Sequence, residues 1–69
     1  MESLSRREKQ IVDALLAGCT NKEIAQQLGV SDQTIKNQLT TLYKKVGVSS
    51  RLELVVLAME RRDKQNRRE

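Results

Sequence analysis

The chain has 69 residues, enough for one small domain with a limited core, near the lower size at which a domain folds alone. It contains no histidine and one cysteine, which excludes zinc fingers, the usual metalloenzyme ligand sets and the Ser/His/Asp or Cys/His nucleophile systems. The net charge of +4 is by itself a weak argument for nucleic acid. With no proline, three glycines and no glycine-rich phosphate loop, the sequence predicts a helical protein without enzymatic activity, metal or cofactor.

The first helix is predicted over residues 5–17. Ser5 and Glu8 have the spacing of a capping box, in which each side chain accepts a hydrogen bond from a helix-start amide of the other residue. Gly18 follows at the position where a left-handed residue commonly ends a helix. Apolar residues at helical spacing give this helix one buried stripe, made of Leu4, Ile11, Val12, Leu15 and Leu16.

The lone Cys19 comes directly after this helix. We expect a small, half-buried residue at a helix end, with a redox switch as the alternative. No apolar run has the length of a membrane span and no signal-peptide pattern opens the chain. These features predict a soluble protein without membrane contact, located in the cytoplasm.

Two further helices are predicted over residues 21–28 and 32–46. Their boundaries carry the same signals, namely a capping box at Thr20 and Glu23, an N-cap at Ser31 with Asp32 behind it, and stop glycines at Gly29 and Gly47. Only residues 29–31 join the two helices. A three-residue turn that begins with glycine, between two short amphipathic helices, is typical of a helix-turn-helix, although an ordinary helical hairpin has the same spacing.

The predicted third helix has two distinct faces. One is apolar, with spacings of four, three and four residues, and consists of Ile35, Leu39, Leu42 and Val46. The opposite ridge carries side chains that can reach base edges and phosphates, namely Gln33, Lys36, Asn37, Thr40 and Lys44. A solvated polar face is the alternative. However, no acidic residue occurs between Asp32 and Glu53, whereas a purely solvating surface usually mixes both signs of charge.

The fourth helix, predicted over residues 50–62, starts at a capping-box pair, Ser50 and Glu53, and is apolar on more than one face. One stripe can cover the core and consists of Leu54, Val55 and Ala58. A second stripe is expected to be exposed and consists of Leu52, Val56 and Met59. Exposed apolar patches of this kind usually mark an interaction site, which predicts a twofold homodimer through this helix. The charged tail, residues 63–69, is expected to continue the helix briefly and then fray.

Motifs from all four predicted helices together resemble one family. The matching segments are Leu4-Ser5-x-Arg7-Glu8, Gly18-x-x-Asn21-Lys22-Glu23-Ile24-Ala25-x-x-Leu28, Ser31-x-x-Thr34-Ile35-Lys36 and Tyr43-x-Lys45-Val46-Gly47-Val48-x-Ser50-Arg51. Residues 4–59 resemble the DNA-binding domain of the LuxR/FixJ/GerE family of bacterial transcriptional regulators. The resemblance implies an all-α, compact four-helix domain over residues 1–62, with the second and third helices as the DNA-reading pair.

The resemblance also implies residue roles. Lys36, Asn37 and Thr40 match positions that face the major groove. Positions near the phosphate backbone or helix ends are matched by Thr20, Asn21, Lys22, Ser31, Thr34, Lys45 and Arg51. Thr20 and Ser31 can act as caps at the same time, and Glu8 and Arg51 can instead pair inside the fold. The chain departs from the family pattern at Gln38, where histidine is frequent, and at Val46, where leucine is usual.

The expected partner is therefore double-stranded DNA, bound sequence-specifically in the major groove by a homodimer on an inverted repeat. The family implies the output domain of a response-regulator or quorum-sensing type of regulator, with an N-terminal regulatory domain outside this chain and RNA polymerase as a further candidate partner. Two other interpretations stay open. One is a promoter-element reader of sigma-factor type, and the other is a helical dimerisation or adaptor module that does not bind DNA.

Overall fold

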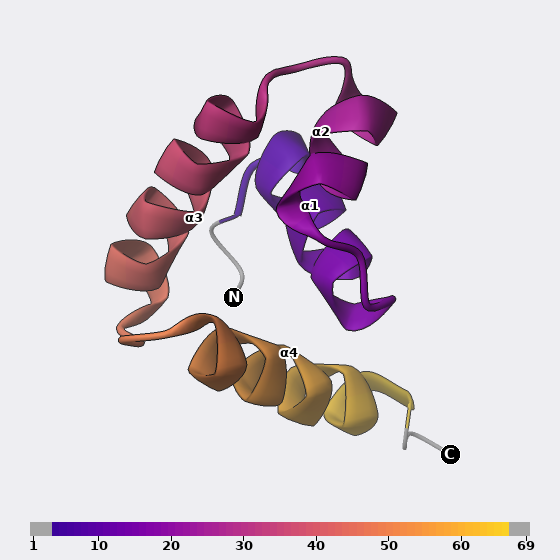
Figure 1. The fold of residues 1–69 in the computed structure, drawn as a ribbon. Coiled ribbons are helices and arrows are strands. Elements are labelled where there is room, and N and C mark those ends of the chain that lie inside the picture. Colours follow the sequence, from indigo (N-terminus) through magenta and orange to yellow (C-terminus); the bar gives the residue numbers. More distant parts are fainter. Residues whose placement is uncertain (1–3, 67–69) are drawn as a thin grey trace.

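The computed structural model describes residues 4–66, with side chains described through residue 61. This part of the chain forms four helices and no strand: α1 (Arg6–Leu16), α2 (Asn21–Leu28), α3 (Asp32–Val46) and α4 (Arg51–Asn66). In Figure 1, α3 runs along one side of the molecule and α4 lies across its end. The prediction of an all-α, four-helix fold is confirmed.

The first residues of the tail extend α4, as expected. The helix continues past residue 62 to Asn66, because the polar residues of the tail are compatible with a helix and include no glycine or proline that would end it. The expected fraying now concerns residues 67–69, which lie outside the described residues.

The predicted N-caps are present. In α1 the Ser5 hydroxyl accepts from the Glu8 amide at 3.1 Å, and the Glu8 carboxylate accepts from the Ser5 amide at 2.9 Å. The same reciprocal pair starts α2, between Thr20 and Glu23. Ser31 caps α3 by accepting from the amide of residue 34 at 3.1 Å.

The start of α4 differs from the expected capping box. The Ser50 hydroxyl accepts from the Glu53 amide at 3.2 Å, as predicted. The Glu53 carboxylate, however, accepts a hydrogen bond from the backbone amide of Ser49 at 2.7 Å. In the expected capping box it would accept from the amide of Ser50. A glutamate side chain can reach either amide, because two bent residues precede the helix.

The core collects apolar side chains from every helix. The largest fully buried side chains are Ile11 from α1, Ile24 from α2, Ile35 and Leu42 from α3, and Leu54 from α4. Full burial of one such side chain contributes about 1.5–3 kcal/mol. The predicted stripes are therefore confirmed, except that Leu4, Leu16, Val46 and Val55 are only partly buried against this cluster.

The turn between α2 and α3 depends on Gly29. Its φ of +72° and ψ of 33° place it in the left-handed region, which glycine adopts without steric cost. The amide of the next residue, Val30, donates to the Ala25 carbonyl at 3.0 Å, and the Val30 side chain packs against the core. This combination is a Schellman motif, and it fixes the direction in which the chain enters α3.

We expect Gly29→Ala to lower the free energy of unfolding by about 1–2 kcal/mol, because a Cβ in the left-handed region meets its own backbone. Apart from the adjacent backbone, no heavy atom lies within 4 Å of the position that a Cβ would take at residue 29, so the cost comes from backbone conformation alone. Gly29→Asn should cost less, since asparagine tolerates this region better. Urea unfolding gives the free energy of unfolding of wild type and of both variants. Equal values for wild type and Gly29→Ala would contradict the left-handed turn.

Candidate nucleic-acid interface

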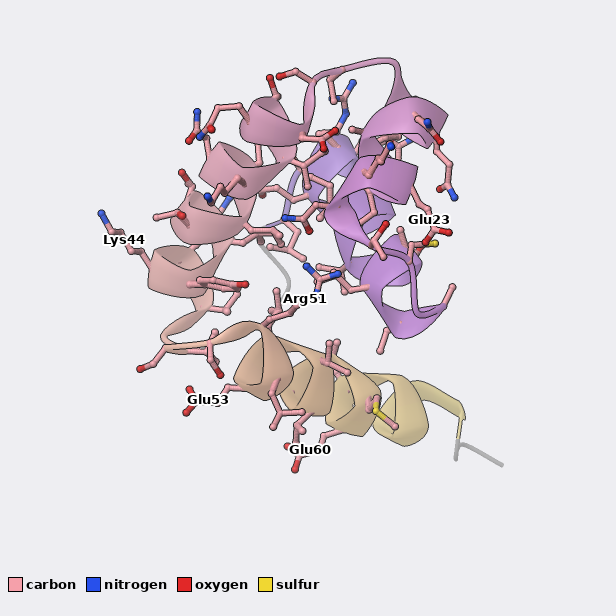
Figure 2. The ribbon with its side chains drawn as sticks, in the orientation of Figure 1. Glu23, Lys44, Arg51, Glu53 and Glu60 are labelled. Atoms are coloured by element: carbon pink, nitrogen blue, oxygen red, sulfur yellow. The ribbon has the colours of Figure 1, made fainter. Side chains whose placement is uncertain are left out.

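The polar ridge of α3 points away from the rest of the protein. All five of its predicted members are exposed, namely Gln33, Lys36, Asn37, Thr40 and Lys44. The buried residues Ile35, Leu39 and Leu42 lie on the opposite side of the same helix. Figure 2 shows Lys44 extending outward from α3, away from the other helices. Core packing therefore orients this ridge toward the solvent.

Side chains on the ridge are partly ordered by bonds within the helix. The Gln33 amide nitrogen donates to the Asn37 side-chain oxygen at 2.9 Å, one turn further along. The Thr40 hydroxyl donates to the Lys36 carbonyl at 3.1 Å. The Asn37 amide nitrogen and the Gln33 side-chain oxygen have no hydrogen-bond partner among the described residues, so one donor group and one acceptor atom remain available.

The residues expected near phosphates lie at four helix ends. Thr20, Asn21 and Lys22 lie at the start of α2, and Ser31 and Thr34 lie in the first turn of α3. The hydroxyls of Ser31 and Thr34 lie 2.9 Å apart. The remaining two are Lys45 in the last turn of α3 and Arg51 at the start of α4. The two cap residues, Thr20 and Ser31, use their side-chain oxygens for the helix amides.

Lys45 forms an ion pair with Glu8. Its ammonium nitrogen lies 2.9 Å from the Glu8 Oε1 atom, and the two side chains are 37% and 16% exposed, respectively. The Lys45 hydrogen bond first, and the Ser5 amide second, hold the pKa of the Glu8 carboxyl below its usual value. The positive charge of Lys45 is thus paired with a carboxylate of α1. No spacing rule predicts this ion pair, because the two residues are 37 positions apart.

Arg51 connects the start of α4 to the start of α2. Its guanidinium donates to the Asn21 side-chain oxygen and, at 2.7 Å, to the backbone carbonyl of Cys19. Glu8 and Arg51 do not pair with each other, although the sequence had allowed it. Glu8 pairs with Lys45, and Arg51 donates to Asn21 and Cys19. Cys19 is half-buried in the loop before α2, as expected, and its sulfur accepts a hydrogen bond from the side-chain amide nitrogen of Gln27 at 3.6 Å.

Gln38, the position that departs from the family pattern, lies partly buried on α3. Its side-chain oxygen is buried and has no hydrogen-bond partner among the described residues. An unpaired buried oxygen costs free energy, which offsets what the burial of the rest of this side chain contributes. It lies outside the exposed ridge.

Residues 2–58 match the family model of the bacterial regulatory proteins of the luxR family. The chain belongs to this family. The luxR-family match spans all of the helices except the last part of α4. The members of this family are described as bacterial regulatory proteins.

Individual relatives of this luxR-family chain are regulators from several bacteria. The chain is 41% identical over 58 residues to the transcriptional regulatory protein YdfI of Bacillus subtilis, which covers 84% of the chain and 27% of that protein. It is 46% identical over 57 residues to the probable transcriptional regulatory protein SgaR of Hyphomicrobium methylovorum, covering 83% and 27%. The HTH-type transcriptional regulator MalT of Vibrio campbellii is 38% identical over 55 residues, covering 80% of the chain and 6% of MalT. The chain thus spans about a quarter, or less, of the length of these relatives.

No solved structure matches the chain. None of the helices within residues 4–66 combines the length and apolar character needed to cross a membrane. In the same part of the chain, no group of three or more histidine, cysteine, aspartate or glutamate residues is placed to hold a metal ion.

The ion pair between Glu8 and Lys45 should make stability depend on pH. Because folding lowers the pKa of Glu8, the pair stabilises the fold above the unfolded-state pKa, and this contribution is lost as the pH falls through the folded-state pKa. Glu8→Gln keeps an oxygen for the Ser5 amide but removes the charge. We expect this variant to be less stable than wild type near pH 7, by at most about 1 kcal/mol, and to lose less stability on acidification.

Urea unfolding over a pH series measures this effect. Glu23→Gln is the matched control, because Glu23 occupies the same capping position in α2 and has no cationic partner among the described residues. It should keep the pH dependence of wild type. An identical pH dependence in wild type and Glu8→Gln would show that the ion pair contributes nothing to stability.

Proposed function

We propose that the chain is the DNA-binding output domain of a bacterial transcriptional regulator and places α3 in the major groove of double-stranded DNA. The observation that carries the proposal is the exposed ridge of α3, which lies opposite the buried stripe and contains no acidic residue. A major groove admits an α-helix, and in helix-turn-helix proteins the second helix of the motif enters it. Here that helix is α3, which follows the turn at Gly29.

The chemistry of the ridge fits base recognition. A lysine such as Lys36 can donate to guanine O6 and N7, and an amide can pair with the N6 and N7 atoms of adenine. The bond between Gln33 and Asn37 leaves the Asn37 amide nitrogen and the Gln33 side-chain oxygen without partners among the described residues, and adenine offers an acceptor for such a donor and a donor for such an acceptor. The Thr40 hydroxyl is engaged with the helix backbone, and its methyl group can contact a thymine methyl.

Phosphate contacts are proposed on either side of α3. The start of α2 carries the exposed Lys22, and helix starts favour anions because their first amides lack partners within the helix. The start of α3 supplies Ser31 and Thr34, and its end supplies Lys44, which is exposed, and Lys45, which is shared with Glu8. Such contacts hold α3 in register on the duplex without reading sequence.

The complete regulator is proposed to contain more than this domain. The relatives are several times longer than the matched region, and they are named as regulators of transcription. An additional regulatory domain, on the response-regulator or quorum-sensing plan, would then receive the signal, and RNA polymerase is a candidate partner. The test is an in vitro selection of random duplex DNA with the purified 69-residue chain. An enriched sequence supports the proposal, and binding without any enrichment contradicts sequence-specific recognition.

Two single substitutions should distinguish base contact from phosphate contact. Lys36→Ala should cost about 1–3 kcal/mol on the selected duplex and relax the preference at one base pair. Lys22→Ala should weaken binding to selected and scrambled duplexes alike and lower the salt slope by about 0.9, because one fewer phosphate is neutralised. Fluorescence anisotropy across a salt series measures both. If Lys36→Ala binds both duplexes like wild type, the ridge of α3 is not the reading surface.

We also propose that two copies associate through α4 and read an inverted repeat. The helix-4 patch, defined as Leu52, Val56 and Met59, is 71%, 46% and 53% exposed, and these are the exposed large hydrophobic residues of the described chain. Figure 2 shows Glu53 and Glu60 on the outer side of the same helix, away from the core. An apolar strip with a charged rim is the usual composition of a protein interface. A twofold arrangement would present two α3 helices to neighbouring half-sites.

Replacing the whole helix-4 patch by glutamine, in Leu52→Gln/Val56→Gln/Met59→Gln, should leave the fold intact because all three side chains are exposed. Affinity for a duplex with one half-site should stay the same. Cooperative binding to the inverted repeat should be lost, which gel-shift titrations on both duplexes measure. Cooperativity that survives in the variant would show that the two copies meet elsewhere or not at all.

A further inference from the structure

The start of α4 and the start of α2 are thirty residues apart in the chain, and the Arg51 side chain joins them. One guanidinium nitrogen donates to the Asn21 side-chain oxygen, and the other donates to the Cys19 carbonyl at 2.7 Å. Figure 2 shows Arg51 extending from α4 toward the other helices. Both acceptors lie within three residues along the chain, so a single planar guanidinium holds the segment that leads into α2.

This contact determines which way the Asn21 amide faces. A guanidinium offers only donors, so it requires the oxygen of Asn21 and repels the NH₂ group. A flip of the amide would bring two donor groups together, and the orientation is therefore fixed. The Asn21 Nδ2 atom has no acceptor among the described residues. The side chain is half-buried, and the part of it that can still bind a ligand is a donor.

We propose that Arg51 is a positioning residue that fixes Asn21 so that its amide nitrogen donates to a DNA phosphate at the start of α2. This rests on the proposed function, in which the start of α2 lies against the duplex backbone. The family resemblance implies that Arg51 lies near the phosphate backbone or a helix end, which allows a direct contact with phosphate. Its two bonds inside the fold favour the indirect role, because they commit the guanidinium to the segment before and at the start of α2.

Asn21→Asp separates binding from stability. The carboxylate keeps an acceptor for Arg51 and suits the first turn of a helix, so the melting temperature should stay equal or rise. The variant loses the donor and faces the phosphate with a negative charge, so affinity for the selected duplex should fall by about tenfold or more. Gln26→Glu is the matched control, since it makes the same amide-to-carboxylate change at an exposed site on the same helix. It should change affinity much less.

Arg51→Lys tests the positioning role itself. Lysine keeps the positive charge but is a point donor that does not reproduce the guanidinium fork across Asn21 and Cys19. If Arg51 contacted phosphate directly, this variant would bind DNA much like wild type. The positioning role instead predicts a loss similar to that of Asn21→Ala, about tenfold, and no further loss when the two substitutions are combined. Fully additive losses would overturn the inference.

A spectroscopic measurement follows the same amide. In wild type the Asn21 side-chain NH₂ resonances should shift on DNA binding, and in Arg51→Lys they should show averaging of the amide orientation before DNA is added. Unchanged wild-type resonances on DNA binding, or equal affinities of Asn21→Asp and Gln26→Glu, would overturn the inference while the proposed function stands. If the wild-type chain selects no duplex, both fail together.

Discussion

The buried stripe of α3 is the constraint on which the rest of the structure depends. Ile35, Leu39 and Leu42 are at most 2% exposed, and α3 packs against each of the other three helices. These side chains fix the rotation of α3 about its own axis. A rotation by one residue, about 100°, would bring a charged residue such as Lys36 into the core, where it would have no partner. The orientation of the polar ridge is therefore a consequence of core packing and requires no additional contact by the ridge residues themselves.

The cations near the ridge differ in how far the fold engages them. Between residues 31 and 51 the chain has Lys36, Lys44, Lys45 and Arg51 against one acid. The fold engages two of these cations, Lys45 with Glu8 and Arg51 with Asn21 and Cys19. Lys36 and Lys44 stay exposed on α3 without an ion-pair partner among the described residues. The charge of Lys45 is paired with a carboxylate, whereas Arg51 keeps its full charge because both of its acceptors are neutral. Lys36 and Lys44 lie on the surface that is proposed to read the bases.

Local rules predicted most of the fold, and contacts between distant residues account for what they missed. Capping pairs three residues apart and the period of apolar residues act within one or two turns, so Ser5, Thr20 and the stripe of α3 could be identified from the sequence. The pairs Glu8–Lys45 and Arg51–Asn21 join residues 37 and 30 positions apart, and no spacing rule covers them. The tail was expected to extend α4 briefly, and the described helix ends at Asn66; no glycine or proline in the tail marks an exact end.

In the proposed positioning role, Arg51 gives α4 a part in DNA recognition that its separation of 30 residues from Asn21 does not suggest. The helix begins at Arg51, is anchored in the core by Leu54 and Ala58, and exposes the helix-4 patch on its other side. In the proposed dimer, the patch would fix one α4 relative to the other. Leu54 would then transmit this geometry to the core and α3, and Arg51 would transmit it to the start of α2. Because these connections are short and each element is packed, the spacing of two half-sites would be set by rigid contacts within each copy and not by a flexible linker.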